Sequence, residues 1–302
     1  MPSDLSARYA FIAAQTDDFA VTDLCRTLAV SRSGFYAWQQ RAPSADPLTP
    51  VVVAAFRRHA RRYGARRLVA DLQAAQCAIG RRRVRRIMRA ENLQAIQPKS
   101  YVPRTTNSRH GGRMSPNLLA EMVITQPHQA YVSDITYLPL LSGAWAYLAT
   151  WLDLFTRRIV GWAVAGHMEA SLIIRALQRA LWRGPLPRGI VAHSDRGGQY
   201  VDAEYRALLQ AYGFQQSMSR AGETYDNAYA ESLFSRYKAE LLEDGAFRDV
   251  AEAELETCAY IERYYNPIRR HSALGYLSPM DFEEAYYQRT KPTLLTEERN
   301  SS

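Results

Sequence analysis

The sequence predicts an α/β fold, a mixed and partly parallel sheet with helices on its faces, preceded by an all-helical region. Charge divides the chain, because residues 1–117 carry 20 Lys and Arg against 7 Asp and Glu, whereas residues 118–302 carry 18 against 23. Runs rich in Tyr, Trp, Val, Leu and Ile at 130–141, 144–154 and 157–166 are typical of buried strands. A segment with helical periodicity at 168–183 and a short apolar run at 189–193 continue the pattern.

Length and composition limit the class of protein. The 302 residues, 47% of them hydrophobic, suffice for two domains or for one domain with a substantial arm. No apolar run approaches the length of a transmembrane helix, and the N-terminus shows no signal-peptide pattern. Cys25, Cys77 and Cys258 are scattered, which favours reduced thiols and argues against a zinc site. We therefore expect a cytoplasmic protein that does not enter a membrane.

Residues 1–45 are predicted to form a small helical domain. A helix is expected at 5–14, and an apolar stripe with helical spacing follows between Val21 and Leu28. Ser31 can cap a second helix, so that the segment looks like a helix-turn-helix. Arg32 and Ser33 would then enter a DNA groove. The alternative is a helical hairpin that only packs.

Residues 51–95 are predicted to form a second helix-turn-helix-like domain, after a linker with three prolines at 41–50. Helical periodicity is broken at Tyr63-Gly64 and resumes at 81–93. Twelve arginines and one acid, Asp71, lie between residues 57 and 89. So many like charges destabilise helices unless phosphates neutralise them, although a solvated face or a GC-rich genome would also produce arginines. The candidate DNA contacts are Arg66, Arg67, Arg81, Arg82, Arg83, Arg85, Arg86 and Arg89.

The remaining boundaries follow from composition. Residues 96–120 are polar and contain prolines and glycines, so we expect a linker or an extended arm in which Lys99 and Arg104 contact phosphates. The core is predicted at 121–290, and residues 291–302 read as a tail. In the loop at 217–227, Arg220 is a further candidate phosphate contact.

Three carboxylates in the core indicate metal-dependent chemistry. Asp134 lies in a predicted strand, Asp195 follows an apolar run just before Gly197, and Glu231 shares the polar stripe of a predicted helix with Lys238. Acids that converge repel one another unless cations neutralise them, and hard oxygen ligands suit Mg²⁺ or Mn²⁺. Two such ions can clamp a phosphodiester. Asp153 competes for this role, but we interpret it as structural.

Five segments carry a resemblance to a known family. They read SDITY at 133–137, LDLFTRRIVGW at 152–162, HSDRGGQY at 193–200, DNAYAESLFSRYK at 226–238 and YNPIRRHSALGYLSPMDF at 265–282. The chain resembles DDE-class insertion-sequence transposases, specifically the second-reading-frame (OrfB-type) product of two-frame elements in the retroviral integrase superfamily. The resemblance implies an RNase H-like, mixed five-stranded sheet, with Asp134, Asp195 and Glu231 as catalytic metal ligands and Lys238 as a DNA contact.

The resemblance also implies a function. A transposase of this family would bind the terminal inverted repeats of its element through residues ~20–115, then cleave DNA and transfer strands to target DNA in the bacterial cytosol. Synapsis requires at least a dimer, and an upstream-frame helix-turn-helix protein, or a fusion with it, is an expected partner. The alternatives are a catalytically inactive DNA-binding regulator and an RNase H-like nuclease without strand transfer. Arg269, Arg270 and His271 could touch DNA or could cover the catalytic helix.

Overall fold

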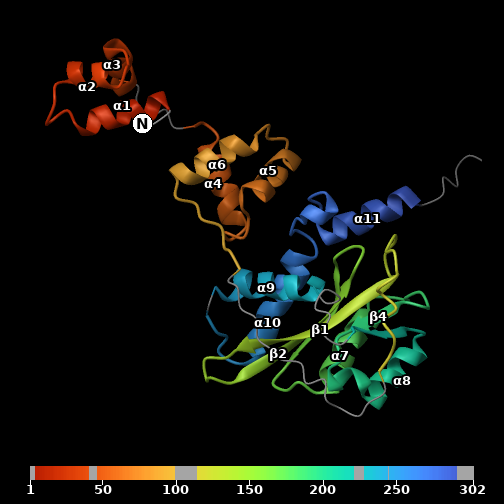
Figure 1. The fold of residues 1–302 in the computed structure, drawn as a ribbon. Helices are drawn as coiled ribbons and strands as arrows, with labels where there is room; N and C mark the ends of the chain where they lie inside the picture. Colours follow the sequence, from red (N-terminus) through yellow and green to blue (C-terminus); the bar gives the residue numbers. More distant parts are fainter. Residues whose placement is uncertain (1–3, 41–45, 99–113, 221–227, 244, 291–302) are drawn as a thin grey trace, which may run out of the picture. The chain divides into compact units, whose positions relative to one another are not determined.

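A computed structural model describes residues 4–40, 46–98, 114–220, 228–243 and 245–290 (Figure 1). The chain divides into two compact units, Met1–Ala54 and Ala55–Ser302. The arginine-rich helices thus group with the sheet rather than with the N-terminal helices. Among the residues described, no helix is long and apolar enough to cross a membrane.

The first unit is helical, and its helices lie where the sequence predicts them. It contains α1 (Leu5–Ala14), α2 (Val21–Thr27) and α3 (Arg32–Gln40). Their apolar side chains meet in a small core that includes Ile12 and Phe35, both with no exposed surface. The helix-turn-helix pattern therefore encloses a core of its own.

The arginine-rich region forms α4 (Thr49–Arg58), α5 (Ala65–Ala74) and α6 (Arg81–Ala90). The boundary between the two units falls within α4. Leu68 and Leu72 on α5 and Val84 and Ile87 on α6 are buried, so each helix has the expected single apolar stripe.

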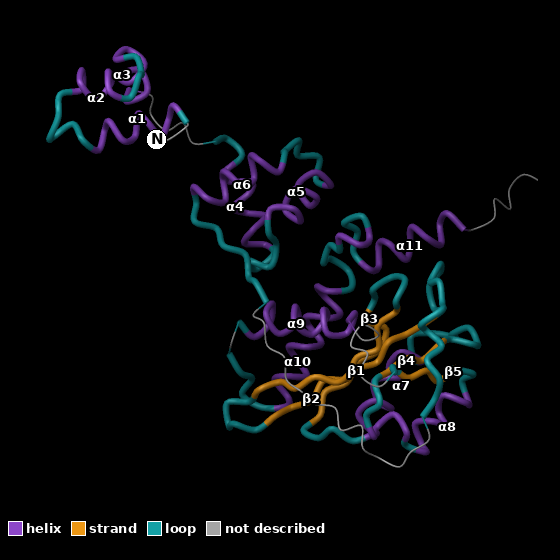
Figure 2. The backbone as a smooth tube through the Cα atoms, viewed as in Figure 1, coloured by secondary structure: helices purple, strands orange, loops and turns teal. Residues whose placement is uncertain are grey.

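The sheet contains the five strands that the resemblance implied. They are β1 (Ala130–Pro139), β2 (Trp145–Asp153), β3 (Ile159–Ala165), β4 (Val191–Ser194) and β5 (Gln215–Met218). The order is β3-β2-β1-β4-β5, with β1, β2 and β3 antiparallel and β4 parallel to both β1 and β5 (Figure 2). The predicted mixed, partly parallel sheet is confirmed.

Helices cover both faces of this sheet (Figure 1). On one face, α7 (Ala170–Leu181) and α8 (Ala203–Ala211) pack on a core cluster that includes Tyr131. On the other face, α9 (Ala228–Leu242) and α10 (Val250–Tyr260) pack on a cluster that includes Val132. Because side chains alternate along a strand, the even-numbered residues of β1 face α9.

Shorter elements complete the core. A 3₁₀ turn spans Gly198–Val201, a π-helical segment Ile261–Tyr265 continues α10, and α11 runs from Pro279 to Thr290. Helix α7 approaches β3 so closely that a Cβ at Gly161 would lie 2.1 Å from the Ala176 carbonyl oxygen. Only glycine therefore fits at this crossing.

Candidate active site beside β1 and β4

Asp134 and Asp195 are neighbours because of the parallel pairing of β1 with β4. Val132 pairs with His193, and the same register continued by two residues sets Asp134 beside Asp195. Adjacent strands are about 4.8 Å apart, and residues in the same register point to the same face. Both carboxylates are half-buried, and the face they share is the one that α9 covers.

Local hydrogen bonds orient the two carboxylates. Asp195 Oδ1 accepts from the Gly197 N–H at 2.9 Å, which forms the turn that ends the strand. Asp134 Oδ1 accepts from the Ile135 N–H at 2.8 Å. Backbone groups thus orient both acids, and Asp195 lies at the end of β4, as its position before Gly197 predicted.

Tyr200, a residue that the sequence did not single out, is close enough to both acids for their charges to shift its pKa. Its side chain is buried, and its hydroxyl lies 3.1 Å from Ser133 Oγ. Burial raises the pKa of Tyr200 well above its ordinary value, and the charges of Asp195 and Asp134 raise it further. The phenol therefore stays protonated between two negative groups.

Helix α9 brings Lys238 to the same place. Leu233, Phe234 and Tyr237 are buried against the sheet, whereas Glu231 is exposed and Lys238 is half-buried. Burial lowers the pKa of Lys238, and the nearby carboxylate of Asp134 counteracts this by raising it. The ammonium group thus lies within electrostatic reach of the first strand acid.

Glu231 lies in the first turn of α9, seven residues before Lys238. That separation corresponds to about 10 Å along a helix axis. Across the residues that the structure describes, no group of three His, Cys, Asp or Glu side chains is arranged to hold a metal ion. The structure therefore brings Asp134 and Asp195 together, with Lys238 within electrostatic reach of Asp134, whereas Glu231 does not complete a metal-holding group with the two strand acids.

Two further polar residues of the core are structural. Asp153 is fully buried and accepts hydrogen bonds from the N–H groups of Phe155, Thr156 and His128 at 2.7, 3.0 and 2.8 Å. His193 is also buried, with its ring nitrogens 2.8 and 3.2 Å from the hydroxyls of Ser217 and Ser219. The interpretation of Asp153 as a turn residue is thus confirmed.

The candidate DNA contacts fall into three groups. Those with exposed side chains are Arg32, Ser33, Arg66, Arg81, Arg82, Arg85, Arg86, Arg89 and Arg220, and Arg83 is half-buried. Arg67 turns inward, where its Nε donates to the Arg270 carbonyl oxygen at 2.9 Å. Lys99 and Arg104 lie outside the described residues.

The two alternatives for Arg269 and Arg270 are resolved by their contacts. Arg269 is buried and donates to both carboxylate oxygens of Glu240 on α9, with Nη2–Oε1 2.6 Å and Nε–Oε2 2.9 Å. Arg270 bonds to Asp71 of α5 at 3.2 Å. Arg269 thus packs against α9, and Arg270 against α5. Sequence reasoning missed Glu240, although it follows Leu233 and Tyr237 on the same buried stripe at i, i+4 and i+7.

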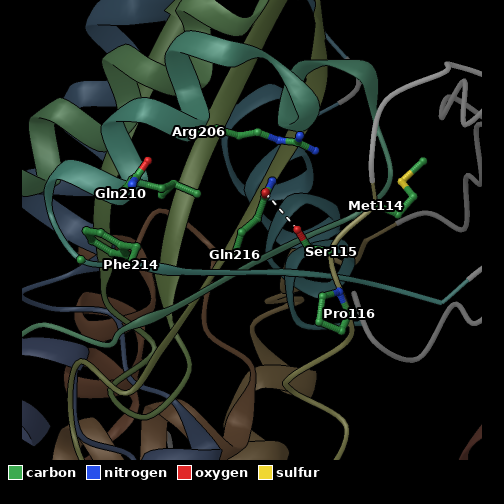
Figure 3. A pocket seen from close by; sticks show the side chains of 9 residues that line it. Met114, Ser115, Pro116, Arg206, Gln210, Phe214 and Gln216 are labelled. Carbon is green, nitrogen blue, oxygen red and sulfur yellow. Dashed lines mark hydrogen bonds between the residues drawn. The ribbon is translucent and has the colours of Figure 1, made fainter.

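Two cavities lie near the core. One, of about 580 Å³, opens beside β5 and α8, where the Ser115 hydroxyl donates to Gln216 Oε1 at 3.0 Å (Figure 3). The other, of about 470 Å³, lies at the start of α9, where the Arg157 guanidinium stands 4.0 Å from the centre of the Tyr229 ring. Neither cavity is lined by Asp134, Asp195 or Glu231.

Comparison with protein families agrees with this architecture. The integrase core domain family matches residues 124–224 and, in a second pattern, residues 212–279. An HTH-like domain family matches residues 43–101, which include α4, α5 and α6.

Two bacterial proteins are similar to nearly the whole chain, and one solved structure is similar to about half of it. The transposase InsF for insertion sequence IS3A of Escherichia coli (strain K12) is 39% identical over 286 residues, which cover 91% of this chain and 98% of that protein. The insertion element IS600 uncharacterized 31 kDa protein of Shigella sonnei is 38% identical over 271 residues, covering 88% and 99%. A solved HTLV-2 integrase catalytic core domain, in complex with magnesium, is 13% identical, covers 52% of this chain and 97% of that one, and has a TM-score of 0.41.

Proposed function

Because this chain belongs to the IS3 transposases, with an integrase core domain and an HTH-like domain, we propose that it cleaves the ends of its element and transfers the strands with a divalent metal held by Asp134, Asp195 and Glu231. The observation that supports this most strongly is the parallel register of β1 and β4. It sets the first two acids side by side on the face that α9 covers.

The donor set fits a hard divalent cation. Asp134 and Asp195 offer carboxylate oxygens at one place beside the sheet, and their charges add to burial in raising the pKa of the buried Tyr200. Oxygen ligands of this kind suit Mg²⁺ or Mn²⁺, and two ions are proposed. Bound ions of this type polarise a phosphodiester and make water a stronger nucleophile.

Glu231 is proposed as the third ligand. Its side chain is exposed in the first turn of α9, where a helix end moves at lower cost than its buried middle. A movement of this turn toward β1 would bring the carboxylate to the strand acids. Lys238, already beside Asp134, would hold a phosphate of the element end next to the scissile bond.

The DNA-binding surface is proposed to follow the exposed arginines. Arg82, Arg85, Arg86 and Arg89 project from the polar side of α6. Phosphates would neutralise these like charges and release counterions. Arg32 and Ser33 of α3 would add base contacts, and Arg66, Arg81, Arg83, Arg220, Lys99 and Arg104 would add phosphate contacts.

The proposed assembly on DNA is a homo-oligomer. Joining two element ends requires two active sites in one complex, so at least a dimer is expected, with terminal inverted repeats and target DNA as ligands. An upstream-frame helix-turn-helix protein, or a fusion with it, is a further proposed partner.

The test is an assay with labelled element-end DNA, Mg²⁺ and either wild-type protein or Asp134→Asn. We expect the wild type to give nicked and joined products and Asp134→Asn to bind the DNA while its product yield falls about 10³-fold or more.

Replacing Arg82, Arg85 and Arg86 with Gln should weaken DNA binding in the same assay and reduce the salt dependence of the binding constant, a slope of log K against log salt concentration, by about 3.

The products distinguish the alternatives. Cleavage without joining would identify a nuclease. A shifted DNA band with no products from the wild type, at any Mg²⁺ or Mn²⁺ concentration, would identify a regulator and contradict the proposal.

A further inference from the structure

We propose that the buried ion pair between Glu240 and Arg269 is a positioning device for α9, and that the arginine-rich helices act on that helix through it. The inference rests on the proposed function, because α9 carries Glu231 and Lys238. Among the residues that the structure describes, the hydrogen-bond partners of Glu240 and Arg269 include neither Asp134 nor Asp195, so the pair is assigned a positioning role rather than a catalytic one.

The pair is enclosed and fully hydrogen-bonded. Exposed fractions are 5% for the Glu240 side chain and 1% for that of Arg269. Besides Arg269, the Tyr260 hydroxyl donates to Glu240 Oε2 at 2.8 Å. Burial alone would raise the pKa of Glu240, but the hydrogen bonds and charge of Arg269 lower it, so the carboxylate stays ionised. One carboxylate of α9 is thus fixed from two directions.

The arginine-rich region holds the residues on both sides of Arg269. The Tyr63 hydroxyl donates to the Ile268 carbonyl oxygen at 3.2 Å and accepts from the Arg270 N–H at 2.7 Å. Arg67 donates to the Arg270 carbonyl oxygen. Tyr63 is itself fully buried. The backbone that presents Arg269 to α9 is therefore held by residues at the start of α5.

The same region also contacts α9 directly. Arg62 Nε donates to the backbone carbonyl oxygen of Glu240 at 3.1 Å. Its guanidinium lies 4.5 Å from the ring centre of Tyr264, which follows Tyr260 on the neighbouring helix. The segment between α4 and α5 thus acts on Glu240 in two ways. Arg62 hydrogen-bonds to the main chain of Glu240, and Tyr63 holds the backbone around Arg269, which binds the side chain of Glu240.

Electrostatics around the pair support a specific role. Burial, together with the charges of Arg269 and Arg67, lowers the pKa of His271 to about 2, so His271 is neutral. An apolar pair would hold two helices together without the desolvation cost of ionic groups, whereas an ion pair with fixed hydrogen bonds sets one orientation. The cluster therefore determines the register of α9 on the sheet.

The arginine-rich helices have one side with exposed arginines and another side that contacts α9 and the loop at Arg269. Arg82, Arg85 and Arg86 have exposed side chains, whereas Arg62, Tyr63 and Arg67 face α9 and the loop at Arg269. DNA bound to the exposed arginines of α6 would therefore act on a group of helices that is hydrogen-bonded to α9 and to the loop at Arg269.

The test compares wild type with Glu240→Gln, which keeps the shape of the side chain and removes its charge. We expect element-end binding within about twofold of wild type, cleavage reduced about 100-fold by misplacement of the helix, and a higher Mg²⁺ concentration for half-maximal cleavage. Without metal or DNA, hydrogen–deuterium exchange in the α9 peptides should be faster than in the wild type.

Two matched variants separate positioning from stability. Glu283→Gln breaks a partly buried ion pair between α11 and Arg158, in the turn between β2 and β3, and should lower the melting temperature without changing the Mg²⁺ requirement. Glu243→Gln breaks the exposed pair with Arg61 at the end of α9, whose side chains are 48% and 56% exposed, and should change nothing measurable.

A second variant covers the case in which Glu240→Gln does not fold. Tyr63→Phe removes only the hydroxyl that holds residues 268 and 270, and should slow cleavage about tenfold with DNA binding unchanged. Its control is Tyr205→Phe, because Tyr205 is equally buried and its hydroxyl has no hydrogen-bond partner in the described residues.

The outcomes are distinct. Equal losses of cleavage in Glu240→Gln and Glu283→Gln, with an unchanged Mg²⁺ requirement in both, would overturn the proposal, as would equal effects of Tyr63→Phe and Tyr205→Phe. A wild type that never cleaves, combined with faster α9 exchange in Glu240→Gln, would overturn the proposed function while supporting the anchoring.

Discussion

The strand acids and the helix that faces them are held by different means. Asp134 and Asp195 are adjacent because backbone hydrogen bonds set β1 parallel to β4. Helix α9 depends on side chains, namely the apolar contacts of Leu233 and Tyr237 and the ion pair of Glu240 with Arg269. Its first turn, with Glu231, has an exposed carboxylate.

This difference shows which part of the site is ready before substrate binds. A register of backbone bonds cannot slide without moving every side chain to new partners, so the two strand acids are preset. A helix end can shift when a ligand favours the shifted state. We therefore expect metal to bind first at the two strand acids and α9 to complete the site.

The largest effects are expected from substituting an acid of the strand pair or the acid of the helix. Asp195→Asn and Glu231→Gln should each lower cleavage about 10³-fold or more. They should differ in metal binding without DNA, measured by calorimetry with Mn²⁺. Asp195→Asn should abolish binding, because it removes half of the preset pair, whereas Glu231→Gln should retain it within about threefold.

Asp202→Asn is the control for these substitutions. Asp202 caps α8 by accepting from the Tyr205 N–H at 3.1 Å, and Asn caps a helix equally well. Its cleavage and metal binding should match those of the wild type. If Glu231→Gln lost metal binding as completely as Asp195→Asn, the distinction between preset strands and a movable helix would be wrong.

A smaller effect is expected from substituting Lys238, the residue of α9 that lies within electrostatic reach of Asp134. Lys238→Met should slow cleavage about tenfold, or about 1.4 kcal/mol, and should flatten the salt slope of DNA binding by about 1. Metal should bind slightly tighter, because a positive charge next to Asp134 is lost. Lys238→Arg should restore the salt slope. Weaker metal binding in Lys238→Met would contradict its assignment as a phosphate contact.

Much of the fold could be predicted from the sequence. The strands at 130–139, 145–153 and 159–165 and the helices of the first 95 residues lie within a few residues of their predicted positions, because each has a clear hydrophobic period. The positions of Asp134 within a strand and of Asp195 just after a strand end followed from the same patterns. Helices α8 and α11 were not predicted.

Contacts between distant segments could not be predicted. Nothing local indicates that Arg67 turns toward Arg270 while Arg66 is exposed, since both belong to one arginine-rich run. Glu240 was interpretable only as part of a helix, although its place on the buried stripe was a usable signal. A buried acid among apolar neighbours implies a buried cation, but the sequence does not say which arginine supplies it.

Asp134, Asp195 and Glu231 are proposed to share metal once the element end is bound. The most direct test replaces Mg²⁺ with Fe²⁺ and adds ascorbate and peroxide, so that radicals formed at the metal cut the nearby backbone. With DNA bound, we expect cuts beside all three acids in the wild type and no such cuts in Asp134→Asn. Cuts beside Asp134 and Asp195 alone, with none near Glu231 in the DNA complex, would contradict it.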